Sequence, residues 1–330
     1  MNAHDRRLRY ILPVLRRNVL TSHGAMRGPE ARCLEYDLGH WFGVDAARVV
    51  TTASGTASLT AVLRAARALT PHRGRDEVIV PVVTFTSTAL AVLHAGLRPV
   101  FVDVDARTWC LNADLVARRV SDRTLAILAT DLDGTAPDWR ALRRAQKAHG
   151  VPWLLEDAAP AIGTTYYGHP VGARTADAAA FSLNQTKIFG AGEGGFVVAR
   201  TRRFADIVRA LTRYGELDPA ALRRVSNFFG DNAKLPELSA AVARAEFATL
   251  RRRVAAAKCA AAALTAVLGP LAPIAEPGVD PCWHKYRVRL PADTHRGRLE
   301  DALFARGVAV TRQEVAPLSR HPMFAPFCYP

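Results

Sequence analysis

The sequence predicts an α/β fold, in which a large, mostly parallel sheet domain is followed by a smaller C-terminal α+β domain. Between about residues 45 and 200, short apolar runs rich in β-branched residues alternate with helical stretches. The runs are continuously apolar, as is typical of parallel strands that helices cover on both faces. From about residue 236 the composition shifts to alanine and arginine at helical spacing, which indicates a second structural unit.

The predicted sheet is built from seven apolar runs that have the length and composition of strands. In chain order they cover residues 47–54, 76–82, 98–105, 124–132, 152–159, 177–183 and 194–200. Helices are expected between several of these strands, at residues 55–69, 85–96 and 137–150. This alternation indicates that most of the strands pair in parallel.

The C-terminal part has a pattern of its own. It predicts one long helix over 237–268, a proline-rich break over 269–282, a strand over 284–291 and a helix over 296–307. The expected organisation is an N-terminal segment over residues 1–27, a large domain over 28–235 and a small domain over 236–330.

The chain of 330 residues is long enough, and at 49% hydrophobic residues apolar enough, to bury a substantial core. Lys and Arg number 44 against 30 Asp and Glu, which gives a formal net charge of +14. This excess favours anionic partners such as phosphates, nucleotides or nucleic acid. Many arginines lie in helical stretches such as 140–150 and 248–258, where a solvated helix face explains them equally well.

The cysteines and the N-terminus bear on the compartment. Five widely spaced cysteines without a CxxC pair suggest neither a zinc site nor a disulfide framework, so a reducing cytoplasm is expected. The basic N-terminus is interrupted by charge and proline, and we expect no apolar stretch near the roughly 18 residues that a membrane span needs. The sequence therefore predicts neither an export signal nor a membrane helix.

One lysine stands out in a chain that takes most of its positive charge from arginine. Lys187 lies between the apolar run 177–183 and a group of glycines, in the stretch FSLNQTKIFGAGEGG. Arginine stays protonated in any protein environment, whereas a partly desolvated lysine can lose its proton and attack a carbonyl group. The position therefore predicts a nucleophilic amine.

Two other stretches lie where ligands bind in open α/β sheets. SGTASL opens a predicted helix, and the backbone amides of Gly55, Thr56 and Ala57 there favour an anion, although ordinary helix capping explains the same residues. Asp157 ends an apolar strand. Its carboxylate could cap the next segment or keep a pyridinium ring nitrogen protonated.

Gly190, Gly192 and Gly195 form a GxGxxG pattern. A dinucleotide-binding fingerprint requires a strand, the glycines and then a helix, but here the glycines lead into the apolar strand 194–200. We therefore reject a nicotinamide site. The glycines instead permit tight turns and close backbone approach around Lys187.

Five longer motifs follow one another along the chain. They read SGTASL, DEVIVPVVTFTSTALAVLHAGLRPVFVDVD, EDAAPAIGTTYYGHPVG, FSLNQTKIFGAGEGG and GDNAKLPELSAAVARAEFATL. Their order resembles the DegT/DnrJ/StrS sugar aminotransferase family of fold-type I pyridoxal phosphate enzymes, from about Gly28 to the HPMF stretch near the C-terminus. The resemblance implies a seven-stranded large domain, pyridoxal 5'-phosphate (PLP) as cofactor, and a homodimer with shared active sites.

The resemblance also implies a role for individual residues. Lys187 would form the internal aldimine and move the proton between substrate and cofactor carbons, and Asp157 would pair with the ring nitrogen. Phe85 would stack on the ring face, although an aromatic in such a stretch is by default a core residue. The residues implied for the phosphate are Gly55, Thr56, Ala57, Ser182 and, reaching the neighbouring subunit's phosphate, Asn232.

The chain departs from the family pattern in three places. Pro160 stands where the family has glutamine or histidine, so no side chain there bonds the 3-oxygen of the ring, and Asn184 or Gln185 would have to compensate. Lys234 replaces an arginine. The chain ends several dozen residues before members of the family usually do, so part of the small domain is expected to be missing or replaced.

The leading function hypothesis is transfer of an amino group, from glutamate or glutamine, to a keto group of a nucleotide sugar or a cyclitol. Lys187 argues against the family's dehydratase branch, which has histidine there. Pro160 and the short C-terminus favour an alternative, a PLP-dependent decarboxylation, elimination or oxidation. The basic charge leaves a third reading, a non-enzymatic regulator that binds nucleic acid, but no nucleic-acid-binding motif is visible. Tyr166, Tyr167, His169 and His284 fit a structural or a substrate-facing role equally.

Overall fold

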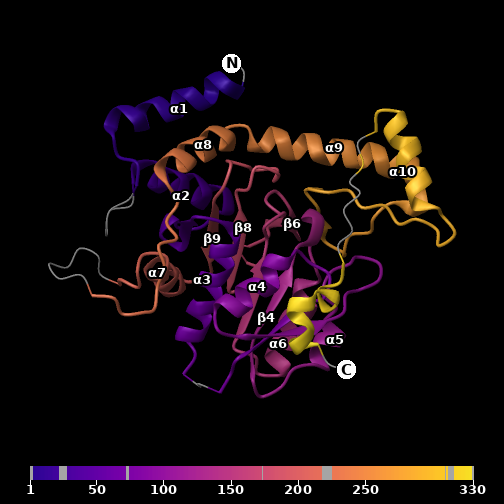
Figure 1. The fold of residues 1–330 in the computed structure, drawn as a ribbon, viewed down its shortest axis with the longest axis horizontal. Helices are drawn as coiled ribbons and strands as arrows, with labels where there is room; N and C mark the ends of the chain where they lie inside the picture. Colours follow the sequence, from indigo (N-terminus) through magenta and orange to yellow (C-terminus); the bar gives the residue numbers. More distant parts are fainter. Residues whose placement is uncertain are drawn as a thin grey trace.

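The computed structural model describes residues 3–21, 28–71, 74–172, 174–217, 225–308, 310 and 316–328. Residues 22–27 of the predicted N-terminal segment lie outside this description. A seven-stranded sheet with helices on both faces forms its centre (Figure 1). The strands are β1 (Val49–Thr52), β2 (Glu77–Pro81), β3 (Arg98–Val102), β4 (Thr124–Thr130), β5 (Trp153–Asp157), β8 (Ala178–Ser182) and β9 (Gly195–Ala199).

The strand order across this sheet is β1-β9-β8-β5-β4-β2-β3. Strand β9 runs antiparallel to β1 and β8, and the remaining pairs are parallel. The prediction of an α/β fold with a mostly parallel sheet is therefore confirmed, and each of the seven expected runs forms a strand. Because β4, β5 and β8 are neighbours, their carboxyl ends place residues 131, 157 and 183 along one edge.

Helices cover the two faces and enclose separate cores. One face carries α3 (Gly55–Ala68), α4 (Thr86–His94) and α7 (Arg202–Leu211). The other carries α2 (Pro29–Phe42), α5 (Ala113–Ala117), α6 (Trp139–Ala148) and α8 (Glu237–Phe247). The N-terminal helix α1 (Ala3–Arg17) packs on α8. This arrangement buries the sheet on both sides, as continuous apolar strands require.

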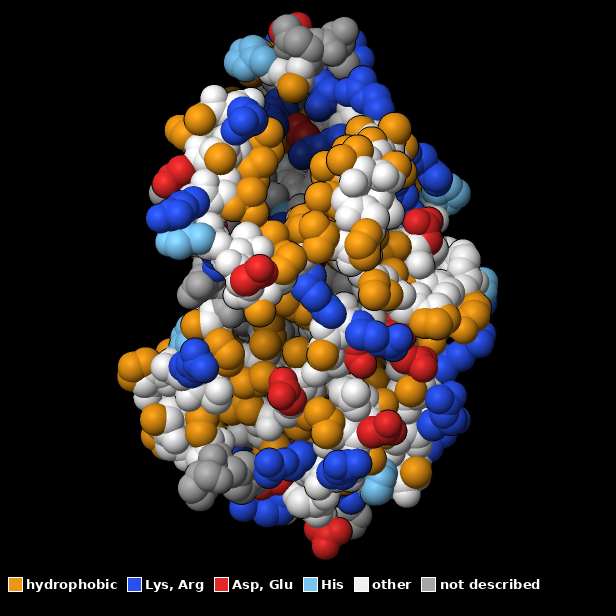
Figure 2. Space-filling view, turned by 90° about the vertical axis from the view of Figure 1, so that its right-hand side faces the viewer, with side chains coloured by type: hydrophobic (Ala, Val, Ile, Leu, Met, Phe, Trp, Pro, Cys, Tyr) orange, Lys and Arg blue, Asp and Glu red, His pale blue; other side chains and the backbone are white. Residues whose placement is uncertain are grey.

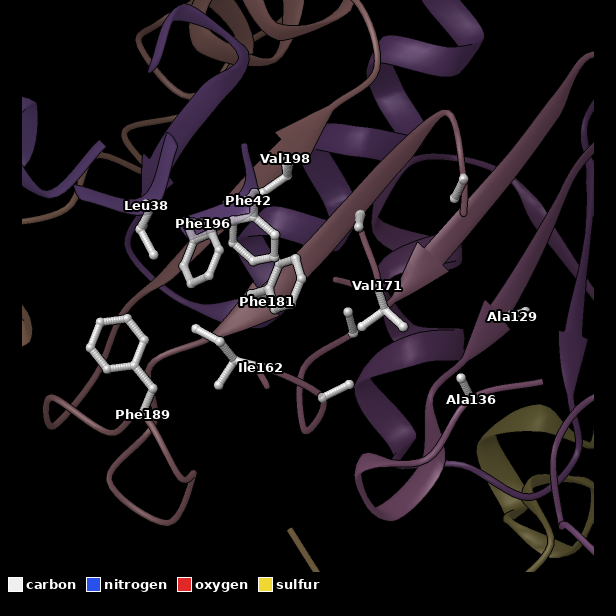
Figure 3. Packing of buried hydrophobic residues seen from close by; sticks show 14 of the residues in the cluster. Leu38, Phe42, Ala129, Ala136, Ile162, Val171, Phe181, Phe189, Phe196 and Val198 are labelled. Carbon is white, nitrogen blue, oxygen red and sulfur yellow. The ribbon is translucent and has the colours of Figure 1, made fainter. Parts of the chain in front are cut away.

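Aromatic rings anchor the end of the sheet from which the lysine loop leaves. Phe181 of β8 and Phe196 of β9 stack with ring centroids 4.6 Å apart, and Phe42 of α2 packs 5.1 Å from Phe181 (Figure 3). Phe189, in the loop between β8 and β9, is fully buried and lies 5.9 Å from the Phe247 ring. The loop that carries Lys187 is thus held at both ends and near its middle.

A small sheet and several short 3-10 turns complete the fold. A second sheet has the order β10-β6-β7, formed by Val279–Asp280, Thr165–Tyr166 and His169–Pro170. Short 3-10 turns are η1 (Ala46–Arg48), η2 (Leu132–Gly134), η3 (Gly269–Leu271), η4 (Leu318–Arg320) and η5 (Pro322–Phe327). The last of these brings Phe324 back onto Phe101 of β3, with ring centroids 5.5 Å apart.

Two sequence predictions for the C-terminal part were wrong. The expected helix over 237–268 is two helices, α8 and α9 (Leu250–Leu268), because Thr249 leaves helical geometry and bonds the Glu246 carbonyl through its amide and hydroxyl. The expected strand over 284–291 does not form. Its amides at Lys285 and Arg289 bond the carbonyls of Asp133 and Leu271 in neighbouring loops. The helix expected over 296–307 is present as α10 (Arg296–Ala305).

One buried carboxylate joins α8 to α2. Glu237, the first residue of α8, accepts hydrogen bonds from the backbone amides of Glu30 (2.8 Å) and Ala31 (3.2 Å) at the start of α2. A β-carbon at position 28 would lie 2.0 Å from a carboxylate oxygen of Glu237, so Gly28 leaves the room that this contact needs. The carboxylate at a helix N-terminus also benefits from the helix dipole. The predicted boundary between residues 235 and 236 stays a prediction.

Helix α9 has an exposed and apolar surface. Leu250, Val254 and Ala261 are buried, whereas Leu264 and Val267 are exposed. Among the described residues, the 22-residue stretch Leu250–Leu271 is the one helical segment whose length and hydropathy would suffice to cross a membrane. The expectation that no stretch comes near this length is corrected here. Alanines account for much of the hydropathy of this stretch.

On the face drawn in Figure 2, Lys and Arg side chains are interspersed with hydrophobic and acidic ones. They do not gather into one continuous stripe on that face. Several arginines form ion pairs, such as Arg244 with Glu30 (2.6 Å) and Arg143 with Asp177 (3.0 Å). Much of the positive charge is therefore paired with carboxylates of the same chain.

Candidate active site

Lys187 lies in the loop between β8 and β9, at the carboxyl edge of the sheet. Its amide bonds the Asn184 carbonyl (2.9 Å), and the Gln185 amide bonds the Gly192 carbonyl (2.8 Å), so the loop folds back on itself. A β-carbon on Gly190 would lie 2.6 Å from the Gln185 carbonyl oxygen. A glycine is required there for the close approach of two backbone segments, as the sequence predicted.

The Lys187 ammonium is half-buried, and its pKa is lowered. Burial is the largest cause, and the positive charge of Lys285 lowers the pKa further. The carboxylates of Asp157 and Asp133 act in the opposite direction. A lower pKa raises the fraction of neutral amine near neutral pH, which is the form that attacks a carbonyl.

Asp157 ends β5 and is almost completely buried, with 3% of its surface exposed. Its Oδ2 accepts a hydrogen bond from the Thr88 hydroxyl (2.7 Å), and its Oδ1 accepts one from the Ala159 amide (3.2 Å). Burial raises the pKa of Asp157, whereas these hydrogen bonds and the charge of Lys187 lower it. A cationic N–H group bound at this carboxylate would relieve the cost of its burial.

Helix α4 places two further side chains at the site. Thr88 holds Asp157 from the first turn of α4, and its amide bonds the carbonyl of Phe85, the residue before the helix. Phe85 is 75% exposed. The default reading of this aromatic as a core residue is therefore wrong. Sequence reasoning missed Thr88; its signal is the position one helical turn after Phe85.

The start of α3 adjoins the end of β8. A β-carbon on Gly55 would lie 2.9 Å from the β-carbon of Ser182, so these two predicted phosphate residues are in contact. Ser54 caps α3 by accepting a hydrogen bond from the Ala57 amide (3.1 Å). The first-turn amides of Gly55 and Thr56 have no intrahelical acceptor, as at any helix start. The Ala57 amide, predicted to hold phosphate, is bonded to this cap, and its phosphate role stays a prediction.

Asn232 lies on an exposed segment beside the same helix start. The carbonyl of Ala233 accepts a bond from the Ala53 amide (2.8 Å), which fixes this segment next to α3. The ammonium of Lys234 donates to the Asn232 Oδ1 and lies 4.2 Å from the Tyr214 ring centroid. A recess of about 320 Å³ is lined by neighbouring residues of this region, including Thr56, Ala57 and Asp231. The role of Asn232 toward a second subunit stays a prediction.

These residues fit the groups of PLP one by one. The amine suits the aldehyde, the buried carboxylate suits the pyridinium N–H, and the open Phe85 face suits the ring. The contact between Gly55 and Ser182 gathers helix amides and a hydroxyl where an anionic phosphate is stabilised. Among the described residues, no group of three His, Cys, Asp or Glu side chains could hold a metal ion.

Of the two residues that could compensate for Pro160, Asn184 is occupied within its own loop. The Asn184 side chain accepts from the Thr186 amide (3.1 Å) and donates to Glu193 (2.7 Å), so it serves the loop itself. Gln185 is exposed. The Pro160 carbonyl accepts a weak hydrogen bond from the Cys282 thiol (3.3 Å). The Asn184 side chain is therefore not favoured as a partner of the ring's 3-oxygen, and the role of Gln185 stays a prediction.

Three of the histidines and tyrosines whose role the sequence left open now differ in their surroundings. Burial and the nearby charge of Lys187 lower the pKa of His284 to about 4, so its imidazole is neutral at neutral pH. The Tyr166 hydroxyl donates to Asp138 (2.8 Å), and burial raises the pKa of Tyr166 to about 12, which indicates a structural role. His169 is exposed in the small sheet.

Comparisons with known proteins agree with this geometry. A model of the DegT/DnrJ/EryC1/StrS aminotransferase family matches residues 13–329. The chain is 35% identical over 314 residues to the erythromycin biosynthesis sensory transduction protein EryC1 of Saccharopolyspora erythraea, covering 94% of this chain and 82% of that protein. It is 34% identical to L-glutamine:2-deoxy-scyllo-inosose aminotransferase of Streptomyces lividus, covering 85% and 68%.

A solved structure shows the same architecture. The crystal structure of DesV from S. venezuelae in complex with a ketimine intermediate superposes with a TM-score of 0.87 and 31% sequence identity. The match covers 99% of this chain and 84% of that one. It therefore includes the elements that carry Lys187, Asp157 and Phe85.

Proposed function

The chain belongs to the DegT/DnrJ/EryC1/StrS aminotransferase family, and on that premise we propose that it moves an amino group from glutamate or glutamine to a keto group of a nucleotide sugar or cyclitol, with PLP bound at Lys187. The observation that carries the proposal is the buried Asp157 carboxylate, held by Thr88 and electrostatically coupled to Lys187. Relatives of the chain are named as aminotransferases of both substrate types.

When bound, PLP would supply an aldehyde for reversible condensation with amines and an electron-accepting ring. Lys187 Nζ would hold that aldehyde and then take and return the proton of the reacting carbon. The Asp157 carboxylate would keep a proton on the ring nitrogen. Phe85 would fix the ring plane, while the amides of Gly55 and Thr56 and the Ser182 hydroxyl would bind the phosphate.

The first test is covalent attachment of PLP. Purified protein is mixed with PLP, reduced with borohydride and digested, and mass spectrometry locates the modified peptide. We expect the label on Lys187, because its amine has the lowered pKa, and no label at the site in Lys187→Ala. A label of equal yield elsewhere in Lys187→Ala would contradict the assignment, and exposed Lys147→Ala serves as the control.

A different PLP-dependent reaction is the second candidate, a decarboxylation, elimination or oxidation. Its support is Pro160, together with the Asn184 side chain that is occupied within its own loop. A panel of amino donors distinguishes the two. Conversion of bound PLP to the amine form by glutamate or glutamine supports transamination, whereas release of another product without that conversion supports the second candidate.

We further propose that the enzyme acts on small molecules in the cytoplasm as a homodimer. Asn232 is exposed, and the half-buried Lys234 bonds it next to the helix start that would bind phosphate. The exposure of Asn232 leaves it accessible to a second copy. The interspersed charges in Figure 2 give no support to a nucleic-acid surface on that face.

A further inference from the structure

Two acidic side chains, Asp131 and Glu156, lie behind Asp157 at the edge of the large sheet. Glu156 precedes Asp157 in β5, and successive strand residues point to opposite faces, so Glu156 points away from the face on which Thr88 holds Asp157. Asp131 follows β4, and its side chain lies within hydrogen-bond reach of Glu156. Its amide bonds the Asp157 carbonyl (3.0 Å). The two acids thus form a carboxyl pair on the opposite face of the sheet.

The carboxyl pair has too few hydrogen-bond donors. Both side chains are fully buried. The Thr175 hydroxyl donates to one oxygen of Glu156. Among the described residues, the other oxygen of Glu156 and both oxygens of Asp131 have no donor. Two ionised carboxylates only accept hydrogen bonds and repel each other at this approach, whereas one proton on Asp131, donated to Glu156, gives both groups a partner.

Four titratable or charged groups outside the carboxyl pair act on it or are acted on by it. The thiols of Cys110 and Cys282 stay uncharged at neutral pH, because burial raises the pKa of each. Arg200, which interacts with Glu156, is cationic and forms an ion pair with Asp177 (3.3 Å). The fourth group is Asp157, whose charge acts on both members of the pair. The pair is therefore electrostatically coupled to the acid that suits the ring nitrogen.

The charge of the carboxyl pair changes near neutral pH. Burial raises the pKa of Glu156 to about 7 and that of Asp131 well above its usual range. Below pH 7 both acids are protonated and the pair is neutral. Above pH 7 Asp131 keeps its proton and Glu156 is a carboxylate. A negative charge behind Asp157 attracts a cation bound there, and by reciprocity a bound cation favours the charged form of the pair.

We propose that Asp131 and Glu156 are positioning residues for the cofactor: sharing one proton, they place a negative charge behind Asp157 that holds a cationic ring N–H at its carboxylate. The inference rests on the proposed binding of PLP at Lys187 and deepens it. Thr88 acts on Asp157 from one face of the sheet, and the carboxyl pair acts on it from the other.

The test is the pH profile of PLP affinity, measured by fluorescence titration of the full chain between about pH 5.5 and pH 8.5. Glu156→Gln keeps the shape and removes the charge that appears at pH 7. We expect the parent to bind PLP as tightly as Glu156→Gln at the low end and up to about tenfold more tightly at the high end, the effect of one pKa unit of coupling. Lys187 and PLP itself titrate in both proteins, so the ratio of the two affinities reports the pair.

Asp131 has its own variants. Asp131→Asn still donates to Glu156 and should keep the pH profile of the parent, whereas Asp131→Leu removes the donor and should move the rise in affinity to higher pH. Infrared spectra of the PLP-free protein supply a second measurement. In the parent, part of the carbonyl band of protonated carboxyl groups should disappear as the pH rises through 7, and that part should be absent from Glu156→Gln.

Exposed Asp122→Asn is the control and should behave as the parent does, and thermal unfolding verifies that each variant folds. An affinity ratio that is the same at every pH would show that Glu156 only supports the fold, and it would overturn the inference while leaving PLP binding intact. A profile unmoved in Asp131→Leu, or no infrared change near pH 7, would also overturn it. Failure of the parent to bind PLP at any pH would instead overturn the proposed function together with this inference.

Discussion

Thr88 holds the buried carboxylate of Asp157. Asp157 is buried, and the Thr88 hydroxyl gives it the shorter of its two hydrogen bonds. Thr88 in turn bonds the Thr84 hydroxyl (2.9 Å), which bonds Thr130 at the end of β4 (3.1 Å). The ionised form of Asp157 thus depends on a chain of hydroxyls from α4 and β4.

Replacing Thr88 by valine keeps the shape and removes the hydroxyl. We expect the pKa of Asp157 to rise and PLP affinity to fall about tenfold, because a hydrogen bond to a charged group contributes about 1.5 kcal/mol. A fluorescence titration with PLP measures the change. Thr88→Ser should restore affinity, and unaltered affinity in Thr88→Val would show that this hydroxyl is dispensable.

The individual site residues differ in how far the sequence could predict them. Lys187 and Asp157 are signalled by local context, a lysine among glycines and an acid ending an apolar strand. Thr88 and His284 reach the site only because α4 and the segment after β10 fold over it. Their contacts depend on tertiary packing, which no local pattern encodes.

At the scale of elements, the ends of β4 and β5 bring three carboxyl groups together. Asp131 and Glu156 are fully buried, and the amide of Asp131 bonds the carbonyl of Asp157 (3.0 Å). Among the described residues, neither oxygen of the Asp131 carboxylate has a hydrogen-bond donor. One oxygen of Glu156 accepts a hydrogen bond from the Thr175 hydroxyl, and the other has no donor. Two buried carboxyl groups whose remaining oxygens have no donor are best satisfied by sharing a proton.

This cluster predicts a pH dependence of stability. Burial raises the pKa of Glu156 to about 7. Burial also raises the pKa of Asp131 well above its usual range, and the neighbouring groups of Glu156, Asp157 and Cys282 raise it further. The folded state then holds protons that the unfolded chain releases above about pH 4.5. Because the native state binds more protons than the unfolded chain, the stability that these groups give the folded state is lost as the pH rises through 7.

Asp131→Asn removes one acid and donates an N–H to Glu156. We expect the variant to gain stability over the parent by about 1–3 kcal/mol at pH 8 and little at pH 5. Urea unfolding of the PLP-free protein at both pH values measures the difference. His284, whose pKa is lowered, acts oppositely between pH 4 and 6.5 but is common to both proteins. An equal effect at both pH values would indicate a packing change only.

Sequence patterns were sufficient to predict some elements and not others. Continuous apolar runs predicted all seven strands of the large sheet, because burial on both faces leaves a clear signal. The break at Thr249 was missed because no proline or glycine marks it. The prediction of a strand over 284–291 was wrong because a strand must pair with a neighbouring strand. The amides of this segment instead donate to carbonyls of other loops.

For the whole molecule, sharing of active sites between two copies can be tested by mixing inactive variants. We expect Lys187→Ala and Asn232→Leu each to lose activity, since one lacks the amine and the other a predicted phosphate ligand. If Asn232 serves the neighbouring subunit, a mixed dimer contains one site with both residues intact. Refolding the two variants together should then restore part of the aminotransferase activity, and no recovery would place Asn232 in its own subunit's site.

The contact between Glu237 and the start of α2 sets a limit on dividing this chain. A composition change suggests a cut before residue 236, yet that cut would remove the acceptor of the Glu30 and Ala31 amides and uncover the side of α2 on which α8 rests. A shortened catalytic fragment would therefore need its first helix recapped. Any minimal version of the enzyme should retain α8 with the sheet.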